Sequence, residues 1–273
     1  MMRSLWTAAS GMSSQQMQVD TISNNLANVN TFGYKKERVE FKSLLYDTMQ
    51  RANLDRANQT GRPVNLQVGS GVRPIATARI FSQGNLQRTE HQLDFAIEGD
   101  AFFAIQRDED TVAYTKDGAF KVSPTDEGLM IVTSEGYPVL GVDDEPIIIP
   151  EEVMVRDVVV TDDGRLGYRT REGTQEDLGF QIDLVQFSNP QGLEAIGANL
   201  FVVTTASGDP VKESEGEVNR LSILQQGALE MSNVQVANEM VDLIVAQRAY
   251  ELNSRAIQTS DDMLQQANNL KRG

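Results

Sequence analysis

Cysteine is absent from the 273-residue chain, and histidine occurs only once, as His91. Without thiols there can be no disulfide, no thiolate metal site and no nucleophilic cysteine. Histidine-based acid–base chemistry would depend on His91 alone. Its polar segment, RTEHQLD, brings no nucleophile or metal ligands with it, which is typical of a surface position. These absences argue against an enzyme.

Long apolar runs and excess positive charge are also missing. The longest aliphatic clusters, such as 147–149 and 158–160, are far shorter than the roughly 20 residues of a membrane-spanning helix. The start, MMRSLWTAASGMSSQQM, has no continuous apolar stretch before a small-residue cleavage site, so we expect no cleaved signal peptide. The chain carries 24 Lys plus Arg against 39 Asp plus Glu, a net charge of −15. This acidity opposes binding to nucleic acid.

The acidic residues do not form a recognisable catalytic or metal-binding motif. Neighbouring acids such as Asp143-Asp144-Glu145 and Asp261-Asp262 lack the alternating spacing and the closing Glu of a calcium loop. Adjacent acids on a strand point to opposite faces, which also argues against a glycosidase pair. The segment GSGV at 69–72 is neither a phosphate loop nor a dinucleotide fingerprint. We therefore predict no catalytic residue, no metal ligand and no cofactor.

Heptad patterns at both ends predict long amphipathic helices. Between residues 5 and 29 the apolar positions recur at spacings of three, four and seven, and near the other end they recur every seven residues. Such narrow seams are typical of coiled coils, and the alternative is an ordinary core-facing helix at each end. The seam positions are Leu5, Ala8, Met12, Val19, Ile22, Leu26 and Val29, then Val236, Leu243, Tyr250, Ile257 and Leu264.

Between these ends the period changes to that of β-strands. Short runs such as 101–106, 180–187 and 200–205 are rich in β-branched and aromatic residues. They lie between turn signals such as Asp117-Gly118 and Asp163-Gly164. A sheet built from short hairpins can bury a core of its own, whereas two helices with narrow seams cannot. The middle of the chain is therefore predicted to be an antiparallel β body.

The predicted class is α+β: an antiparallel β-rich central body with long N- and C-terminal helices that pair as a coiled coil on assembly. A faint internal repeat marks the edges of the body, because FSQGNLQ at 81–87 resembles LQQGALE at 224–230. We expect the chain to enter and leave the body at neighbouring points, so that the two helices can pair antiparallel. The expected divisions are paired helices in 1–46 and 226–273, an extension or linker at 47–71 and the β body at 72–225.

Several long motifs resemble the bacterial flagellar rod and hook family. They include RSLWTAASGM, VDTISNNLANVNTFGYKK, FSQGNLQRTEHQLDFAIEGDAFFAI, NPQGLEAIGANLF and MVDLIVAQRAYELNSRAIQTSDDMLQQANNLKR. The resemblance covers nearly the entire chain. Both ends and the segment 47–71 are most similar to subunits of the distal rod.

The resemblance implies a structural subunit that polymerises into a helical tube, transmits torque and carries the export channel. Its expected location is the flagellar basal body, spanning the periplasm after type III export. Its expected partners are further copies of itself, other rod subunits, hook subunits and the surrounding ring or bushing proteins, without membrane insertion. Another flagellar axial protein, a proximal-side rod or hook subunit, is the alternative. A more distant alternative is an enzyme or peptidoglycan-binding module, which would need acids clustered in a cleft.

The segment SNNLANVNTFGYKK, residues 23–36, continues a helical pattern yet is rich in asparagine, a mediocre helix former. In a tube the amides of Asn24, Asn25 and Asn28 would bond between subunits and fix their register. Capping of the helix end is the alternative. The predicted assembly interface therefore consists of Leu5, Met12, Val19, Asn24, Asn25, Leu26, Asn28, Val236, Leu243, Tyr250, Ile257 and Leu264.

Overall fold

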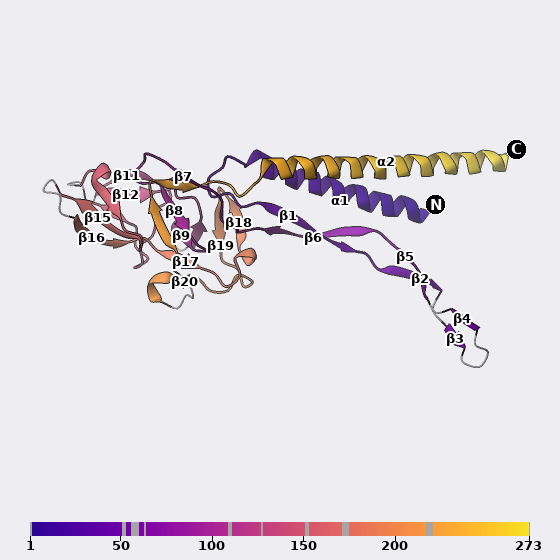
Figure 1. The fold of residues 1–273 in the computed structure, drawn as a ribbon, viewed down its shortest axis with the longest axis horizontal. Helices are drawn as coiled ribbons and strands as arrows, with labels where there is room; N and C mark the ends of the chain where they lie inside the picture. The colour runs from indigo at the N-terminus through magenta and orange to yellow at the C-terminus, as the bar shows by residue number, and fades with distance from the viewer. Residues whose placement is uncertain are drawn as a thin grey trace. The chain divides into compact units, whose positions relative to one another are not determined.

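The computed structural model describes residues 2–50, 53–55, 60–62, 64–108, 111–126, 128–150, 153–170, 175–216 and 221–272. It has the predicted α+β class, with a helix at each end and antiparallel strands between them (Figure 1). The chain divides into two compact units. Unit 1 is Met1–Ala27, Glu37–Ala78 and Gln235–Gly273, and unit 2 is Asn28–Lys36 and Arg79–Val234.

Unit 1 consists of two helices and a β ribbon. Helices α1 (Met2–Ala27) and α2 (Val236–Arg272) lie side by side and run in opposite directions (Figure 1). Much of α1 is Ser, Thr, Asn and Gly, which are weak helix formers, whereas α2 is rich in Ala, Leu, Glu, Gln and Arg. Helix α1 therefore depends more than α2 on its packing partners.

The β ribbon of unit 1 includes most of the segment 47–71, which the sequence analysis treats as an extension or linker. Its strands pair two by two, and residues 51–52, 56–59 and 63 lie outside the described part. A ribbon largely exposed to solvent needs no alternation of apolar and polar residues, so its sequence carries little strand signal. The pairs are β1 (Glu37–Ser43) with β6 (Val72–Arg79), β2 (Tyr46–Gln50) with β5 (Leu66–Gly69), and β3 (Asn53–Asp55) with β4 (Thr60–Arg62).

The N-terminal helix also ends well before residue 46, the limit expected from the sequence. After Ala27 the amide of Thr31 donates to the carbonyl of Asn28, which closes a turn. Gly33 then adopts a left-handed conformation, with φ of 66°. A Cβ atom there would lie 2.6 Å from the backbone nitrogen of Asp117, so no larger residue fits. The chain thus passes from α1 into unit 2 before it returns to unit 1 at Glu37.

Unit 2 is the β body, and its main sheet has the strand order β18-β19-β10-β9-β17-β20. Its core is apolar and includes Phe95, Phe103 and Ile105, while a second cluster surrounds Phe102 and Phe201. The strands of the main sheet are β18 (Glu194–Gly197), β19 (Leu200–Val202), β10 (Thr111–Thr115), β9 (Phe102–Asp108), β17 (Leu184–Gln186) and β20 (Val211–Lys212).

Two smaller sheets and three short 3₁₀ helices complete most of the body. One sheet is β11 (Lys121–Thr125), β12 (Gly128–Val132) and β13 (Ile148–Ile149). The other is β14 (Val158–Val160), β15 (Arg165–Arg169) and β16 (Gln175–Gln181). The 3₁₀ helices are η1 (Val155–Asp157), η2 (Pro190–Gly192) and η3 (Glu213–Glu215).

The two segments of the internal repeat end in strands that pair with one another. Strand β7 (Leu86–Arg88) pairs antiparallel with β22 (Ala228–Glu230), so that Leu86 lies opposite Glu230. Strand β8 (Phe95–Glu98) pairs antiparallel with β21 (Ile223–Gln226). The prediction that the chain enters and leaves the body at neighbouring points is confirmed.

One buried acid makes the stability of the body depend on pH. Asp183 is buried, and its Oδ2 lies 3.9 Å from Nζ of Lys212, which also donates to Asp144 Oδ1 at 2.7 Å. Burial raises the pKa of Asp183 from 3.8 to about 7, against the opposing effect of Lys212. The folded chain therefore binds a proton between about pH 4 and pH 7 that the unfolded chain releases. The stability that this carboxyl contributes is present below about pH 4 and is lost as the pH rises to about 7.

We predict that Asp183→Asn flattens this pH dependence, because the amide does not titrate. The measurement is urea unfolding of the full chain at about pH 5 and about pH 7.5. The variant should lose less stability than the natural chain between these two values. Asp209→Asn, an identical change at an exposed acid, is the control. If the free energy of unfolding of Asp183→Asn falls between these two pH values as much as that of the natural chain, Asp183 does not titrate in this range.

Candidate assembly interface

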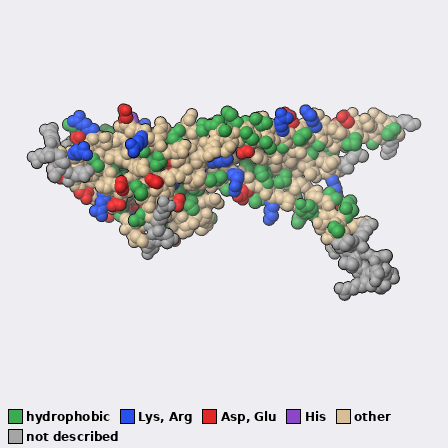
Figure 2. All heavy atoms as spheres, in the orientation of Figure 1, with side chains coloured by type: hydrophobic (Ala, Val, Ile, Leu, Met, Phe, Trp, Pro, Cys, Tyr) green, Lys and Arg blue, Asp and Glu red, His purple; other side chains and the backbone are tan. Residues whose placement is uncertain are grey.

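Exposed apolar side chains are concentrated in unit 1. Of the exposed large apolar residues in the described part of the chain, only Val112, Met154, Leu221 and Ile223 belong to unit 2. The others lie on α1, α2 and the β ribbon, and apolar side chains are visible along the helices in Figure 2. Monomeric proteins rarely expose large contiguous apolar surfaces, so this distribution makes unit 1 the candidate interaction surface.

Two contacts define how α1 and α2 pair within the chain. Nδ2 of Asn25 donates to Oε2 of Glu239 at 3.3 Å. A Cβ atom on Gly11 would lie 3.0 Å from Nδ2 of Asn253, so the helices approach closely there. These two contacts are two heptads apart on each helix, which is the repeat of an antiparallel coiled coil.

The seam of α2 that faces α1 is more polar than the sequence analysis predicts. Glu239, Ala246 and Ser260 are buried at heptad spacing, and Asn253 between them is half-buried. The predicted residues Leu243, Ile257 and Leu264 are half-buried beside this row, while Val236 and Tyr250 are 38% and 36% exposed. A pattern of apolar residues alone does not reveal the small and polar half of the seam.

On α1, the predicted seam lies partly within the most buried row. Ala8, Ser14, Ile22 and Asn25 are the buried residues of this helix, and Ala8 and Ile22 belong to the predicted seam. The four apolar residues of α1 that were predicted for the assembly interface are half-buried. They are Leu5, Met12, Val19 and Leu26.

The buried amide of Asn25 joins three elements of unit 1. Its Nδ2 donates to the carbonyl of Glu37 at 2.8 Å, and its Oδ1 accepts from the amide of Glu37 at 2.9 Å. It therefore pairs with the first residue of β1 as a strand backbone would, while also bonding Glu239 on α2. These bonds of Asn25 lie within one subunit because β1 and α2 both reach it, and a bond between subunits at this position stays a prediction.

The other two predicted asparagines lie in different environments. Asn24 is exposed on α1. Asn28 is half-buried, and its Oδ1 accepts from the hydroxyl of Thr31 at 3.2 Å, beside the turn that ends the helix. The contact of Asn28 is of the capping kind that the sequence analysis kept as its alternative.

The β ribbon contacts α1 at a face of small residues. Gly71 has φ of 110°, and a Cβ atom there would lie 2.2 Å from Oγ of Ser10. Near the start of the helix, Arg3 forms an ion pair with Asp47 of β2. A hollow of about 320 Å³ lies beside this pair and is lined by Trp6 among others. Helix α1 is therefore flanked by α2 and by the ribbon.

The surface of α1 that remains exposed is almost free of charge. Between Met2 and Ala27 the only charged residues are Arg3 and Asp20, and Trp6 is 73% exposed. Serine, glutamine and asparagine provide most of the polar groups instead. The buried centre of a protein interface is depleted in charged residues, because an unpaired charge is costly to desolvate. This face is suited to burial against another protein surface.

Helix α2 also carries an exposed apolar stripe beside the face that packs on α1. Val241, Val245 and Leu252 are 60%, 60% and 64% exposed. At 3.6 residues per turn they lie roughly 100° to 140° around the helix from Ala246, which faces α1. This stripe is suited to packing against a second partner.

Other kinds of site are not found in the described part of the chain. Among the described residues no group of three or more His, Cys, Asp or Glu side chains could hold a metal ion. Neither described helix is long and apolar enough to span a membrane.

Three family models match successive parts of the chain. Residues 5–35 match the flagella basal body rod protein model, and residues 96–168 match the flagellar hook protein FlgE/F/G D1 domain. Residues 225–270 match the flagellar basal body rod FlgEFG protein C-terminal model. The first and last matches fall mainly on the two helices, and the middle one falls on the β body.

Relatives match the chain over its full length. The flagellar basal-body rod protein FlgG of Borreliella burgdorferi is 50% identical over 273 residues, which is 100% of both chains. The protein of the same name from Caulobacter vibrioides is 41% identical, covering 99% of this chain and 100% of its own. That of Bacillus subtilis is 38% identical over 100% of both.

We predict that Asn25→Ala lowers the free energy of unfolding of the full chain by about 1 to 3 kcal/mol, because it removes a hydrogen-bond partner of the half-buried Glu37 backbone and of the buried Glu239 carboxylate. Asn24→Ala is the matched control and should change stability by only a few tenths of a kcal/mol. Urea unfolding followed by far-ultraviolet circular dichroism measures both. Equal losses in the two variants would contradict the role given to Asn25.

Proposed function

The chain belongs to the flagellar basal-body rod protein family, and we propose that its subunits polymerise through unit 1 into the distal rod, a helical tube that transmits torque and carries the export channel. That the chain is a structural subunit of the basal-body rod follows from its full-length relatives. The observation that carries the proposed route of assembly is the concentration of exposed apolar side chains in unit 1.

In the proposed rod, the helices form an inner coiled-coil layer and the β body forms an outer layer. Helix α1 brings a face that is nearly free of charge, and α2 brings the stripe of Val241, Val245 and Leu252. Each would be buried against a second copy of the chain, which removes apolar area from water at every subunit contact. Four predicted interface residues are half-buried in one subunit, so part of each side chain is accessible to a neighbouring subunit. They are Leu5, Met12, Val19 and Leu26.

Membership in the family implies contacts with other flagellar components as well as self-assembly. We propose that the ends of the rod contact other rod subunits and hook subunits, and that its outer surface faces ring or bushing proteins. The rod would span the periplasm, and the chain would leave the cytoplasm by the flagellar export route.

We predict that Val245→Asp blocks polymerisation while leaving the melting temperature of the subunit nearly unchanged. The side chain is exposed in the subunit, so the charge is tolerated there, but the polymer would bury it without a partner. Val112→Asp is the matched control, since it places the same charge at an exposed valine of unit 2. Sedimentation of the polymer and a thermal melt of the subunit provide the two measurements.

Normal polymerisation of Val245→Asp would remove the α2 stripe from the interface. Equal inhibition by Val112→Asp would instead mean that unit 2 takes part in the same contacts. Neither outcome affects the family assignment, which depends on the full-length relatives.

A further inference from the structure

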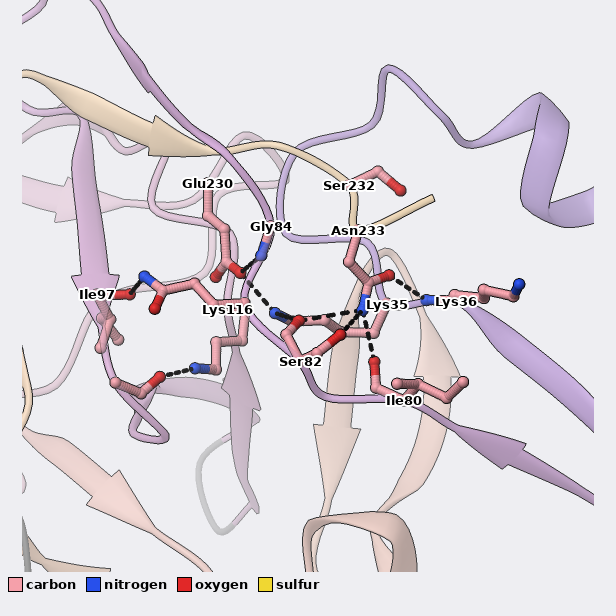
Figure 3. A network of polar contacts seen from close by, with 12 residues as sticks. Lys35, Lys36, Ile80, Ser82, Gly84, Ile97, Lys116, Glu230, Ser232 and Asn233 are labelled. Atoms are coloured by element: carbon pink, nitrogen blue, oxygen red, sulfur yellow. Dashed lines mark hydrogen bonds and ion pairs between the residues drawn. The ribbon is translucent and has the colours of Figure 1, made fainter. Parts of the chain in front are cut away.

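A buried ion pair inside unit 2 joins residues that are far apart in the sequence. The side chains of Lys35 and Glu230 are each 1% exposed, and Nζ of Lys35 lies 2.6 Å from Oε1 of Glu230 (Figure 3). The same ammonium donates to the carbonyl of Ser82 at 3.1 Å. The amide of Gly84 donates to the same carboxylate oxygen at 2.7 Å. Segments near residues 35, 83 and 230 are thereby held at one point.

A second buried lysine lies near this pair. Figure 3 shows Lys116 in the same region as Lys35 and Glu230. Its Nζ donates to the carbonyl of Gly99 at 2.7 Å and lies over the ring of Phe102. Burial, and then the charge of Lys35, lower the pKa of Lys116 to about 8. The charges of Glu230, Asp100 and Glu213 oppose this shift, with Glu230 the largest of the three. The carboxylate of Glu230 thus favours the charged forms of two buried lysines, Lys35 and Lys116.

The backbone around Glu230 fits closely between earlier segments of unit 2. The amide of Gly33 donates to the carbonyl of Glu230 at 2.9 Å. A Cβ atom on Gly84 would lie 1.9 Å from the carbonyl oxygen of Met231, so the two backbones are in direct contact. Asn233 accepts from the amide of Lys36 at 2.8 Å and donates to the carbonyl of Ile80 at 2.7 Å. Residues 230–233 therefore tie together the segments through which unit 2 connects to unit 1.

The order of these groups along the chain has a physical consequence. Both cations come from the first half of the chain, whereas Glu230 belongs to the last strand of unit 2. If the body closed around Lys35 before Glu230 was in place, an ammonium would be buried without its counter-charge, which is strongly unfavourable. Strands β7 and β8 would also lack their partners β22 and β21.

We propose that the Lys35–Glu230 pair is a charge lock that makes folding of unit 2 conditional on docking of residues 228–234. The body then stays open until almost the whole of its chain is available. Because unit 2 ends at Val234, directly before α2, the lock closes only when the chain is complete up to its last helix. This conformational control goes beyond the role of a rod subunit, and it acts on the isolated chain before any assembly.

Hydrogen exchange followed by mass spectrometry on the full-length chain tests the lock. In Glu230→Gln we expect exchange to increase roughly a hundredfold in β9 and β10, together with β7 and β22, because the uncompensated Lys35 destabilises the whole body. The double variant Lys35→Met with Glu230→Leu removes both charges and should restore protection to within roughly tenfold of the natural chain. Asp144→Asn, which removes the exposed partner of Lys212, is the control and should leave β9 and β10 protected.

The proposal is contradicted if Glu230→Gln raises hydrogen exchange only in β7 and β22 while β9 and β10 stay protected. It is also overturned if the double variant is no better protected than the single one. If Glu230→Gln fails to fold, the comparison remains decisive: a folded double variant supports the lock, and an unfolded one contradicts it. Since the measurement uses isolated chains, either result leaves the proposed polymerisation through unit 1 untouched.

Discussion

The hydrogen bonds of Asn25 are the constraint on which the arrangement of unit 1 depends. One buried amide pairs with the backbone of Glu37 at the start of β1 and with the carboxylate of Glu239 at the start of α2. A shift of either helix by one residue would break these bonds and leave buried polar groups without partners. The register of α1 against α2 is therefore set inside each subunit. In the proposed polymer, contacts between subunits would use the outer faces of the two helices and the ribbon.

The two units differ in where they place apolar and charged side chains. Unit 2 encloses its apolar core and buries the ion pair of Lys35 and Glu230 in its interior, where each charge needs its partner. Unit 1 exposes valine, leucine and tryptophan side chains and has only two charged residues on α1. A body that is complete in itself and an open, weakly charged helical unit are what we expect of a subunit whose helices find their remaining partners in a polymer.

The sequence predicted the kinds of elements better than the way in which they join. The helical ends and the β-rich middle could be predicted because apolar periodicity reports which face of an element is buried. The repeat at 81–87 and 224–230 marked the neighbourhood of β7 and β22, which pair with one another. The inner row of α2 was missed because Glu239, Ala246 and Ser260 are buried through close approach and hydrogen bonding, which leave no apolar pattern. The Lys35–Glu230 pair was missed too, since a contact between such distant residues has no local signal.

The proposed burial of the helical unit in the polymer can be measured directly on Trp6, the single tryptophan of the chain, which lies on α1 and is 73% exposed in the subunit. Its fluorescence therefore reports on one position of the proposed interface without any substitution. We predict that the emission of Trp6 shifts to shorter wavelength when subunits polymerise, because a neighbouring copy excludes water from that face. Polymers that form while the emission stays that of a water-exposed indole would contradict burial of this face of α1.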